Sequence, residues 1–197
     1  RARIGRKRDR NQFYAFQEIR RLISSESLPI PVRDQACSLF RTAQNESLLQ
    51  GRSLEGFAAA CVYAACRINT VSRTIEETVA TAKADRAEFQ AAYDALNREL
   101  GLPVEPTNPA EYLPRYASEL ELSSAVERRA QELVDRTKEE GIANGRNPSG
   151  VAAACLYKAA KELDAEVTQC EVADVASVTP VTVRNTFQAL AAEPPTQ

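Results

Sequence analysis

Apolar residues recur three or four positions apart through most of the chain, which is the spacing of one face of an α-helix. No stretch shows the alternation of β-branched and polar residues that is typical of a strand. The pattern therefore predicts an all-α protein. Its expected helices cover residues 11–24, 32–44, 54–67, 75–81 and 86–100, and then 110–120, 124–141, 148–163, 169–176 and 180–192.

The second half of this pattern repeats the first half at an offset of 94 residues. Residues 52–65 and 146–159 share eight identities, namely Arg, Gly, three Ala, Cys, Tyr and a further Ala. Such a period has the size of a small domain and exceeds the roughly 20–50 residues of a solenoid unit. The sequence thus predicts two tandem five-helix domains, 11–104 and 105–197, after a disordered basic linker over 1–10.

Local signals support these helices. Ser53 is a plausible N-cap for the helix over 54–67, and Thr74 with Glu77 three residues later forms a capping-box pattern. The helices over 54–67 and 148–163 are rich in Ala and Cys and apolar nearly all round. We expect each of them to lie buried at the centre of its domain.

Composition narrows the class of protein. The 197 residues are 44% apolar and 26% charged, as in ordinary globular domains, and no apolar run approaches the roughly 18 residues of a membrane span. Five cysteines without a C-x-x-C pair, and the absence of His, predict no zinc site and no cofactor. Most of the cysteines lie in apolar helical patterns as small apolar residues, and their odd number favours a reducing, intracellular compartment. Because Met is absent, we expect the chain to be part of a longer protein.

The net charge of −2 hides an asymmetry. Residues 1–21 hold eight Arg or Lys against two acidic residues, which is +6, so the remaining 176 residues carry −8. A basic segment before an acidic body suggests a polyanionic or acidic partner near the N-terminus. A solvated linker stub is an equally plausible interpretation.

The last two helices of the second repeat have helix-turn-helix proportions. Residues 168–176 would form the first helix, 177–179 a tight turn, and 180–190 the second helix. The residues expected to hold the pair together are Val175, Val178, Val183, Phe187 and Leu190. Near the start of the second helix, the residues expected to face away are Val181, Thr182, Arg184 and Asn185, where a recognition helix presents side chains to the major groove. A packing corner without DNA binding fits the pattern equally well.

Two further sites are candidates. Gly51-Arg52 and Gly145-Arg146 precede the central helices at the repeat spacing, and Arg beside a helix N-terminus suits a phosphate. The alternative is that each Gly ends the preceding helix and each Arg is merely exposed. Repeat one has the same helix-turn-helix layout, but its last helix begins at Arg86 without the Val-Thr-Val-Arg surface, which suggests a different partner. Catalysis has little support, since His, G-x-S-x-G and P-loop motifs are all absent.

These motifs resemble a known family. Gly-Arg, Ala-Ala-Ala-Cys-x-Tyr, Thr-x-x-Glu and a helix-turn-helix recur in order, and Gly101-Leu-Pro103 fits the family's linker. The chain is similar to the cyclin-repeat core of archaeal transcription factor B, the counterpart of eukaryotic transcription factor IIB, and most similar to its haloarchaeal members. The resemblance implies two cyclin-like domains and a monomeric, non-enzymatic initiation factor. It would bind TATA-binding protein on promoter double-stranded DNA and help recruit RNA polymerase, in the cytoplasm of an archaeon or in a eukaryotic nucleus.

The resemblance also implies residue roles. Val181 and Arg184 match the residues that read the element upstream of the TATA box. Contacts with DNA phosphates would come from Gly51, Arg52, Gly145, Arg146, Thr182 and Asn185. Arg86 would contact TATA-binding protein, although family members often carry more basic residues there. A regulatory cyclin that activates a protein kinase is the rival interpretation, because it has the same tandem helical domains.

Overall fold

The computed structural model describes residues 2–102 and 106–191, with side chains from residue 7 onward. Over these ranges the chain forms ten α-helices and one 3-10 helix, with no strand. It divides into two compact units, residues 1–105 and 106–197. The predicted all-α fold is confirmed, and its tandem helical units are cyclin-like. The boundary expected at 104/105 lies outside the described residues.

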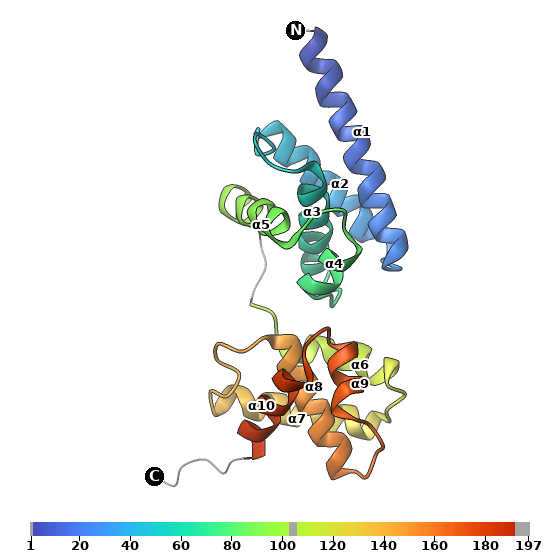
Figure 1. Ribbon diagram of the computed structural model, residues 1–197, viewed down its shortest axis with the longest axis vertical. Helices are drawn as coiled ribbons and strands as arrows, with labels where there is room; N and C mark the ends of the chain where they lie inside the picture. The colour runs from blue at the N-terminus through green and yellow to red at the C-terminus, as the bar shows by residue number, and fades with distance from the viewer. Residues whose placement is uncertain (1, 103–105, 192–197) are drawn as a thin grey trace. The chain divides into compact units, whose positions relative to one another are not determined.

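Each unit is built around one helix. The first unit comprises α1 (Ala2–Ser25), α2 (Ile30–Asn45), α3 (Leu54–Ile68), α4 (Ile75–Thr81) and α5 (Arg86–Leu100). The second comprises η1 (Pro109–Tyr112), α6 (Leu113–Glu119), α7 (Ser124–Glu139), α8 (Pro148–Glu162), α9 (Gln169–Val175) and α10 (Pro180–Ala191). The other helices of each unit pack on α3 or on α8, which lie at the middle of the two units in Figure 1.

The offset of 94 residues holds in three dimensions. Both ends of α2, α3 and α4 differ by 94 from the ends of α7, α8 and α9. The loops before the central helices also correspond, because Gly51 and Gly145 both have φ of 70°, in the left-handed region. The lead helix is where the units differ, since α1 is a single long helix and its counterpart is the short pair η1 and α6.

The central helices α3 and α8 are buried as predicted. Every residue from Gly56 to Cys66 is buried, and Ala59 and Ala153 are fully enclosed. Gly56 and Gly150 let the last helix of each unit cross closely. A Cβ at Gly56 would lie 2.8 Å from the backbone oxygen of Glu88, and one at Gly150 would lie 2.9 Å from Thr182 Cγ2.

The predicted caps are present. The Ser53 hydroxyl accepts a hydrogen bond from the Gly56 amide, 3.1 Å away, at the start of α3. Thr74 and Glu77 form a complete capping box on α4, and Thr168 and Glu171 form the equivalent box on α9. Each box satisfies two backbone amides that the helix itself leaves without a partner.

The expected linker over residues 1–10 is wrong for residues 2–10, because α1 begins at Ala2. This segment is rich in Arg, a good helix former, and it continues the pattern of the helix behind it. It is also held by the end of α2. The buried Gln44 side chain donates to the backbone carbonyl of Arg8 (3.0 Å), and the Arg8 guanidinium donates to Asn45. Arg1 lies outside the described residues.

Candidate nucleic-acid interface

The segment α9–turn–α10 forms the helix-turn-helix predicted for the second repeat. Ser177 adopts φ of 52°, and the Val178 amide donates to the Ala173 carbonyl (3.0 Å), which closes α9 in a left-handed C-terminal turn. The Thr179 hydroxyl then accepts from the Thr182 amide (3.2 Å) and caps α10. All five residues expected to hold the pair together belong to the core of the unit or pack against it, namely Val175, Val178, Val183, Phe187 and Leu190. Val172, Ala173 and Ala176 are buried there as well.

The first turns of α10 present an open face. Val183 is fully buried, whereas Val181 is 56% exposed and Arg184 and Asn185 are exposed. Among the described residues, the Arg184 guanidinium makes no hydrogen bond or ion pair. An exposed aliphatic side chain beside an uncommitted guanidinium suits contact with base edges.

Thr182 departs from the expected outward orientation. Its hydroxyl lies 3.0 Å from the Thr179 hydroxyl, and its Cγ2 methyl is turned toward Gly150 on α8. The side chain is consequently half-buried. Thr182 therefore fixes how α10 starts and how closely it crosses α8, and its hydroxyl is already engaged.

The two Gly-Arg loops have matching internal contacts. Arg52 Nη1 donates to the Leu48 carbonyl (2.7 Å), and Arg146 Nε donates to the Ile142 carbonyl (2.9 Å), each four residues earlier. The recurrence of Gly-Arg at the repeat spacing thus has a structural cause, because each guanidinium closes its own loop. A guanidinium has five donors, so N–H groups remain for a phosphate.

The loop of the second repeat also lies beside the helix-turn-helix. Arg146 Nη1 approaches the Thr186 hydroxyl of α10 at 3.5 Å. Gly145 and Arg146 line a hollow of about 450 Å³ whose lining also includes Lys138 and no acidic residue. The Gly-Arg loop of this unit therefore contacts α10 and lines a hollow that carries two basic residues, Lys138 and Arg146.

The turn between α4 and α5 differs from a helix-turn-helix, so the prediction of the same layout in repeat one is wrong. Ala82 is extended (φ −73°, ψ 157°), and α4 packs chiefly on α3 and α1. The cause is a contact with α1 that repeat two lacks. The nearly buried carboxylate of Glu18 binds Arg21 and also Lys83 of this turn (3.3 Å), while Arg21 donates to the Thr81 carbonyl (2.7 Å).

Arg86, the first residue of α5, is exposed and holds an ion pair. Its Nη1 lies 2.7 Å from Glu76 Oε1 on α4. At the offset of 94 residues, Glu76 corresponds to Cys170, so this pair has no counterpart in the second unit. This ion pair joins the start of α5 to α4 at the surface of the unit.

A basic face of α1 and α2 is a feature that the sequence analysis missed. Burial raises the pKa of the Cys37 thiol, and the charges of Arg41, Arg20 and Arg33 act in the opposite direction, while the charge of Asp34, which pairs with Arg33 (2.8 Å), raises this pKa further. Arg41 also lies over the Phe16 ring, 5.6 Å from its centroid. These side chains come from two helices and form one surface.

Comparison of the two repeats at the offset of 94 residues identifies this face from the sequence. Arg33 and Arg41 correspond to Glu127 and Asp135 on α7, so the charge of this surface reverses between the repeats. The charge count of residues 1–21 could not show it, because half of the face belongs to α2.

Three of the five cysteines behave as expected from the sequence, whereas Cys170 is exposed and Cys37 is half-buried. Cys61, Cys66 and Cys155 are buried, and burial raises the pKa of the Cys66 and Cys155 thiols to about 12. Among the described residues no group of His, Cys, Asp and Glu could hold a metal ion. The helices described are too short or too polar to cross a membrane.

Comparison with known proteins agrees with this architecture. The family model described as "Transcription factor TFIIB repeat" matches twice, over residues 8–99 and 103–193. Transcription initiation factor IIB 1 of Halobacterium salinarum is 56% identical over 96% of this chain and 66% of its own length. Transcription initiation factor IIB 3 of the same organism is 46% identical over 91% of this chain and 57% of its own length.

A relative from a different archaeon shows the same similarity. Transcription initiation factor IIB of Archaeoglobus fulgidus is 44% identical over 97% of this chain and 59% of its own length. The chain thus spans less than two thirds of the length of these relatives. Since both repeats match the family model and the relatives cover nearly all of the chain, it belongs to the TFIIB repeat family of transcription factors.

Proposed function

We propose that the chain is the promoter-binding core of a general transcription initiation factor. Its second unit reads the DNA element upstream of the TATA box through α10. The observation that carries this proposal is the open face of Val181, Arg184 and Asn185 at the start of the second helix of a helix-turn-helix. That end of a recognition helix enters the major groove.

The chemistry of this face suits base reading. The Arg184 guanidinium has two parallel N–H groups for the O6 and N7 acceptors of guanine, and Val181 offers methyl groups to a neighbouring base. The two residues are three apart and lie on the same side of α10. Asn185, one position further, is within reach of the DNA backbone when α10 lies in the groove.

Phosphate contacts from the Gly-Arg loops would hold α10 in register. Arg146 lies beside Thr186 of α10 and lines a hollow free of acidic lining residues, so a phosphate there meets Arg146 and Lys138 together. Arg52 would act similarly in the first unit. Ser53 and Asn147 already accept hydrogen bonds from backbone amides at the starts of α3 and α8. Because those amides are occupied, the guanidiniums supply most of the phosphate binding.

We propose TATA-binding protein and RNA polymerase as the protein partners. The relatives bear the name transcription initiation factor IIB, and the family resemblance assigns Arg86 to the contact with TATA-binding protein. The Glu76 carboxylate pre-orients the Arg86 side chain at the surface of the first unit. In this role the chain acts by binding and performs no catalysis.

A regulatory cyclin is the rival proposal, because it shares the tandem helical architecture. It would need an exposed kinase-binding face in the first unit and has no use for an open Val181–Arg184 face in the second. The double match to the TFIIB repeat model also favours the initiation factor.

A mobility-shift assay on promoter DNA, with and without TATA-binding protein, tests the proposal. We expect a slower-migrating complex that needs both TATA-binding protein and the TATA box. Arg86→Ala should weaken this complex, whereas Arg98→Ala, an exposed arginine on the same helix that pairs with Glu99, should not. A chain that never joins the complex at any concentration would remove the initiation factor and favour the cyclin.

A further inference from the structure

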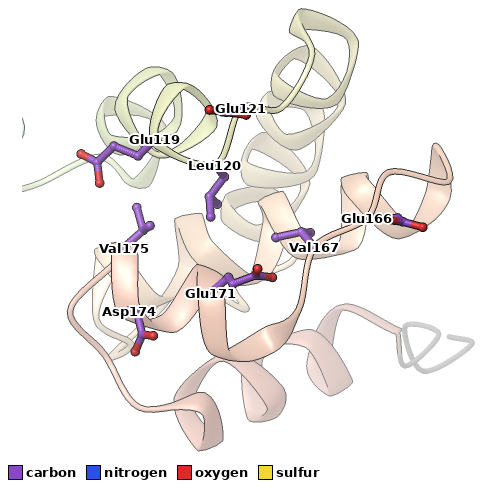
Figure 2. Close-up of a pocket in the computed structure, with 8 residues that line it drawn as sticks. All are labelled: Glu119, Leu120, Glu121, Glu166, Val167, Glu171, Asp174 and Val175. Carbon is purple, nitrogen blue, oxygen red and sulfur yellow. The ribbon is translucent and has the colours of Figure 1, made fainter.

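An acidic hollow lies on the second unit beside α9. It opens between the turn that follows α6, the loop before α9 and α9 itself, with a volume of about 370 Å³ (Figure 2). It belongs entirely to the second unit. The residues that line it are Glu119, Leu120, Glu121, Glu166, Val167, Glu171, Asp174 and Val175.

The floor of this acidic hollow is apolar. Leu120, Val167 and Val175 come from three different segments and are partly buried against the core of the unit. In Figure 2 they face the space between the turn after α6 and α9, where Glu171 points toward this space and Glu119, Glu166 and Asp174 point outward from its edges. The floor therefore offers an aliphatic contact surface inside a charged rim.

The rim is made of carboxylates, and no cation lines the hollow. Glu119 pairs with Arg115 (3.1 Å), which lies outside the lining. Glu171 accepts hydrogen bonds from the Thr168 backbone and side chain, which lower its pKa and keep it ionised. Glu121, Glu166 and Asp174 have no ion pair among the described residues. The hollow thus concentrates negative charge around an apolar floor.

The first repeat fills the equivalent place with its own arginine. At the offset of 94 residues, the positions of Leu120, Val167 and Val175 correspond to Glu26, Arg73 and Thr81 of the first repeat.

These three polar residues contact one another. Arg73 Nε lies 3.6 Å from Glu26 Oε2, Arg73 Nη2 donates to the Glu26 carbonyl (2.9 Å), and Thr81 donates to Glu26 Oε1 (2.7 Å). The Arg73 side chain is only 18% exposed, so this crevice is closed by a guanidinium.

We propose that the acidic hollow of the second unit docks an arginine-bearing segment of a partner protein, with the guanidinium entering the space that Arg73 fills in the first unit. The aliphatic part of the incoming side chain would pack on Leu120, Val167 and Val175. Its charge would be met by the rim carboxylates, for which Arg offers planar, bidentate geometry. This surface is separate from the α10 face and binds a basic protein instead of DNA.

The probe is a fluorescent hexapeptide of alternating Leu and Arg, with citrulline in place of Arg as its neutral twin. Binding to the full chain is followed by fluorescence anisotropy, and NMR of the Leu and Val methyl groups locates it. We expect shifts at Leu120, Val167 and Val175. The citrulline peptide should bind about tenfold more weakly, as expected for the loss of a charge-assisted hydrogen bond.

Two pairs of variants separate the hollow from general attraction to an acidic protein. Val167→Arg installs the arginine that repeat one has at this position and should abolish peptide binding. Leu163→Arg adds the same charge at an exposed site outside the lining of the hollow, so the peptide affinity should stay unchanged within about twofold. Glu121→Gln should weaken binding, while Glu139→Gln, on the exposed surface of α7, should not. Thermal unfolding of all four variants is the control for correct folding.

Three results would overturn the proposal. Equal binding of the citrulline peptide would remove the role of the guanidinium. Equal loss in Val167→Arg and Leu163→Arg, or methyl shifts elsewhere, would mean non-specific attraction. A concentration-dependent dimer that Val167→Arg abolishes would mean that the occupant is a second copy of the chain. None of these outcomes bears on DNA binding by α10.

Discussion

Replacing Gly56 with Ala should destabilise the first unit more than Gly150→Ala destabilises the second, although the two glycines are equivalent in the repeat. A Cβ at Gly56 meets the Glu88 backbone oxygen at 2.8 Å and the Glu88 carbonyl carbon at 3.0 Å. Backbone atoms cannot rotate away, so α5 itself must move. At Gly150 the closest atom is a side-chain methyl of Thr182, at 2.9 Å, and the next lies at 3.9 Å.

The magnitudes follow from two opposing terms. Overpacking a helix crossing costs about 1–3 kcal/mol, and Ala in place of Gly inside a helix returns up to about 1 kcal/mol. We therefore expect a net loss of about 1–2 kcal/mol for Gly56→Ala and about 0–1 kcal/mol for Gly150→Ala. Thr182→Ser should rescue Gly150→Ala, because Ser lacks the clashing methyl but keeps the hydroxyl that contacts Thr179.

Native-state hydrogen exchange of the amides in α3 and α8 measures the opening free energy of each unit separately. A double-mutant cycle of Gly150→Ala and Thr182→Ser should show a coupling free energy of at least about 0.5 kcal/mol between the two sites. If Gly150→Ala costs as much as Gly56→Ala, or the cycle shows no coupling, the close crossings at these glycines do not control the packing of α5 and α10.

The other predictions concern the core, the loops and acid stability. Ala59→Leu or Ala153→Leu should cost its unit about 1–3 kcal/mol, measured by the same exchange experiment, because both sites are fully enclosed. Arg52→Ala and Arg146→Ala should weaken DNA binding equally on all promoter sequences and flatten the salt dependence of affinity, measured by titration at several salt concentrations. The ion pairs of Glu18 lower its pKa. Their contribution to the free energy of unfolding is therefore present above the ordinary carboxyl pKa and disappears as pH falls through the lowered pKa. Acid titration of Glu18→Gln should show less loss of stability than the parent chain.

Much of the fold follows from the sequence because the chain contains a duplication. An element predicted in one repeat can be checked at the equivalent residues of the other repeat. Helical spacing predicts where α3 and α8 lie, and the offset of 94 residues predicts that their small residues occupy equivalent buried sites. Thr74 and Thr168 mark two helix starts correctly, since a capping box depends on residues three positions apart and needs no tertiary information.

Features that depend on distant contacts were not predictable. The turn after α4 departs from a helix-turn-helix because Glu18, 65 positions earlier, holds Lys83. Residues 2–10 are helical because Gln44 of α2 anchors the Arg8 backbone, a contact that no local pattern reveals.

The candidate site likewise combines features that the sequence predicts with features that depend on distant contacts. The exposure of Val181 and Arg184 follows from helical periodicity once Val183 is placed inward. The inward turn of the Thr182 methyl depends on the absence of a side chain at Gly150, 32 positions away. The closing of the Gly-Arg loops by their own guanidiniums likewise requires the loop conformation.

Competition between promoters tests the central claim, that α10 reads the element upstream of the TATA box. Arg184→Ala and the parent chain are titrated, together with TATA-binding protein, against DNA with the natural element and with a scrambled one. Loss of a bidentate contact to guanine costs about 1–3 kcal/mol of discrimination, so Arg184→Ala should bind both DNAs with similar affinity. Arg86→Ala should weaken both complexes alike. If Arg184→Ala keeps the parent's full preference for the natural element, α10 is a packing corner and does not read DNA.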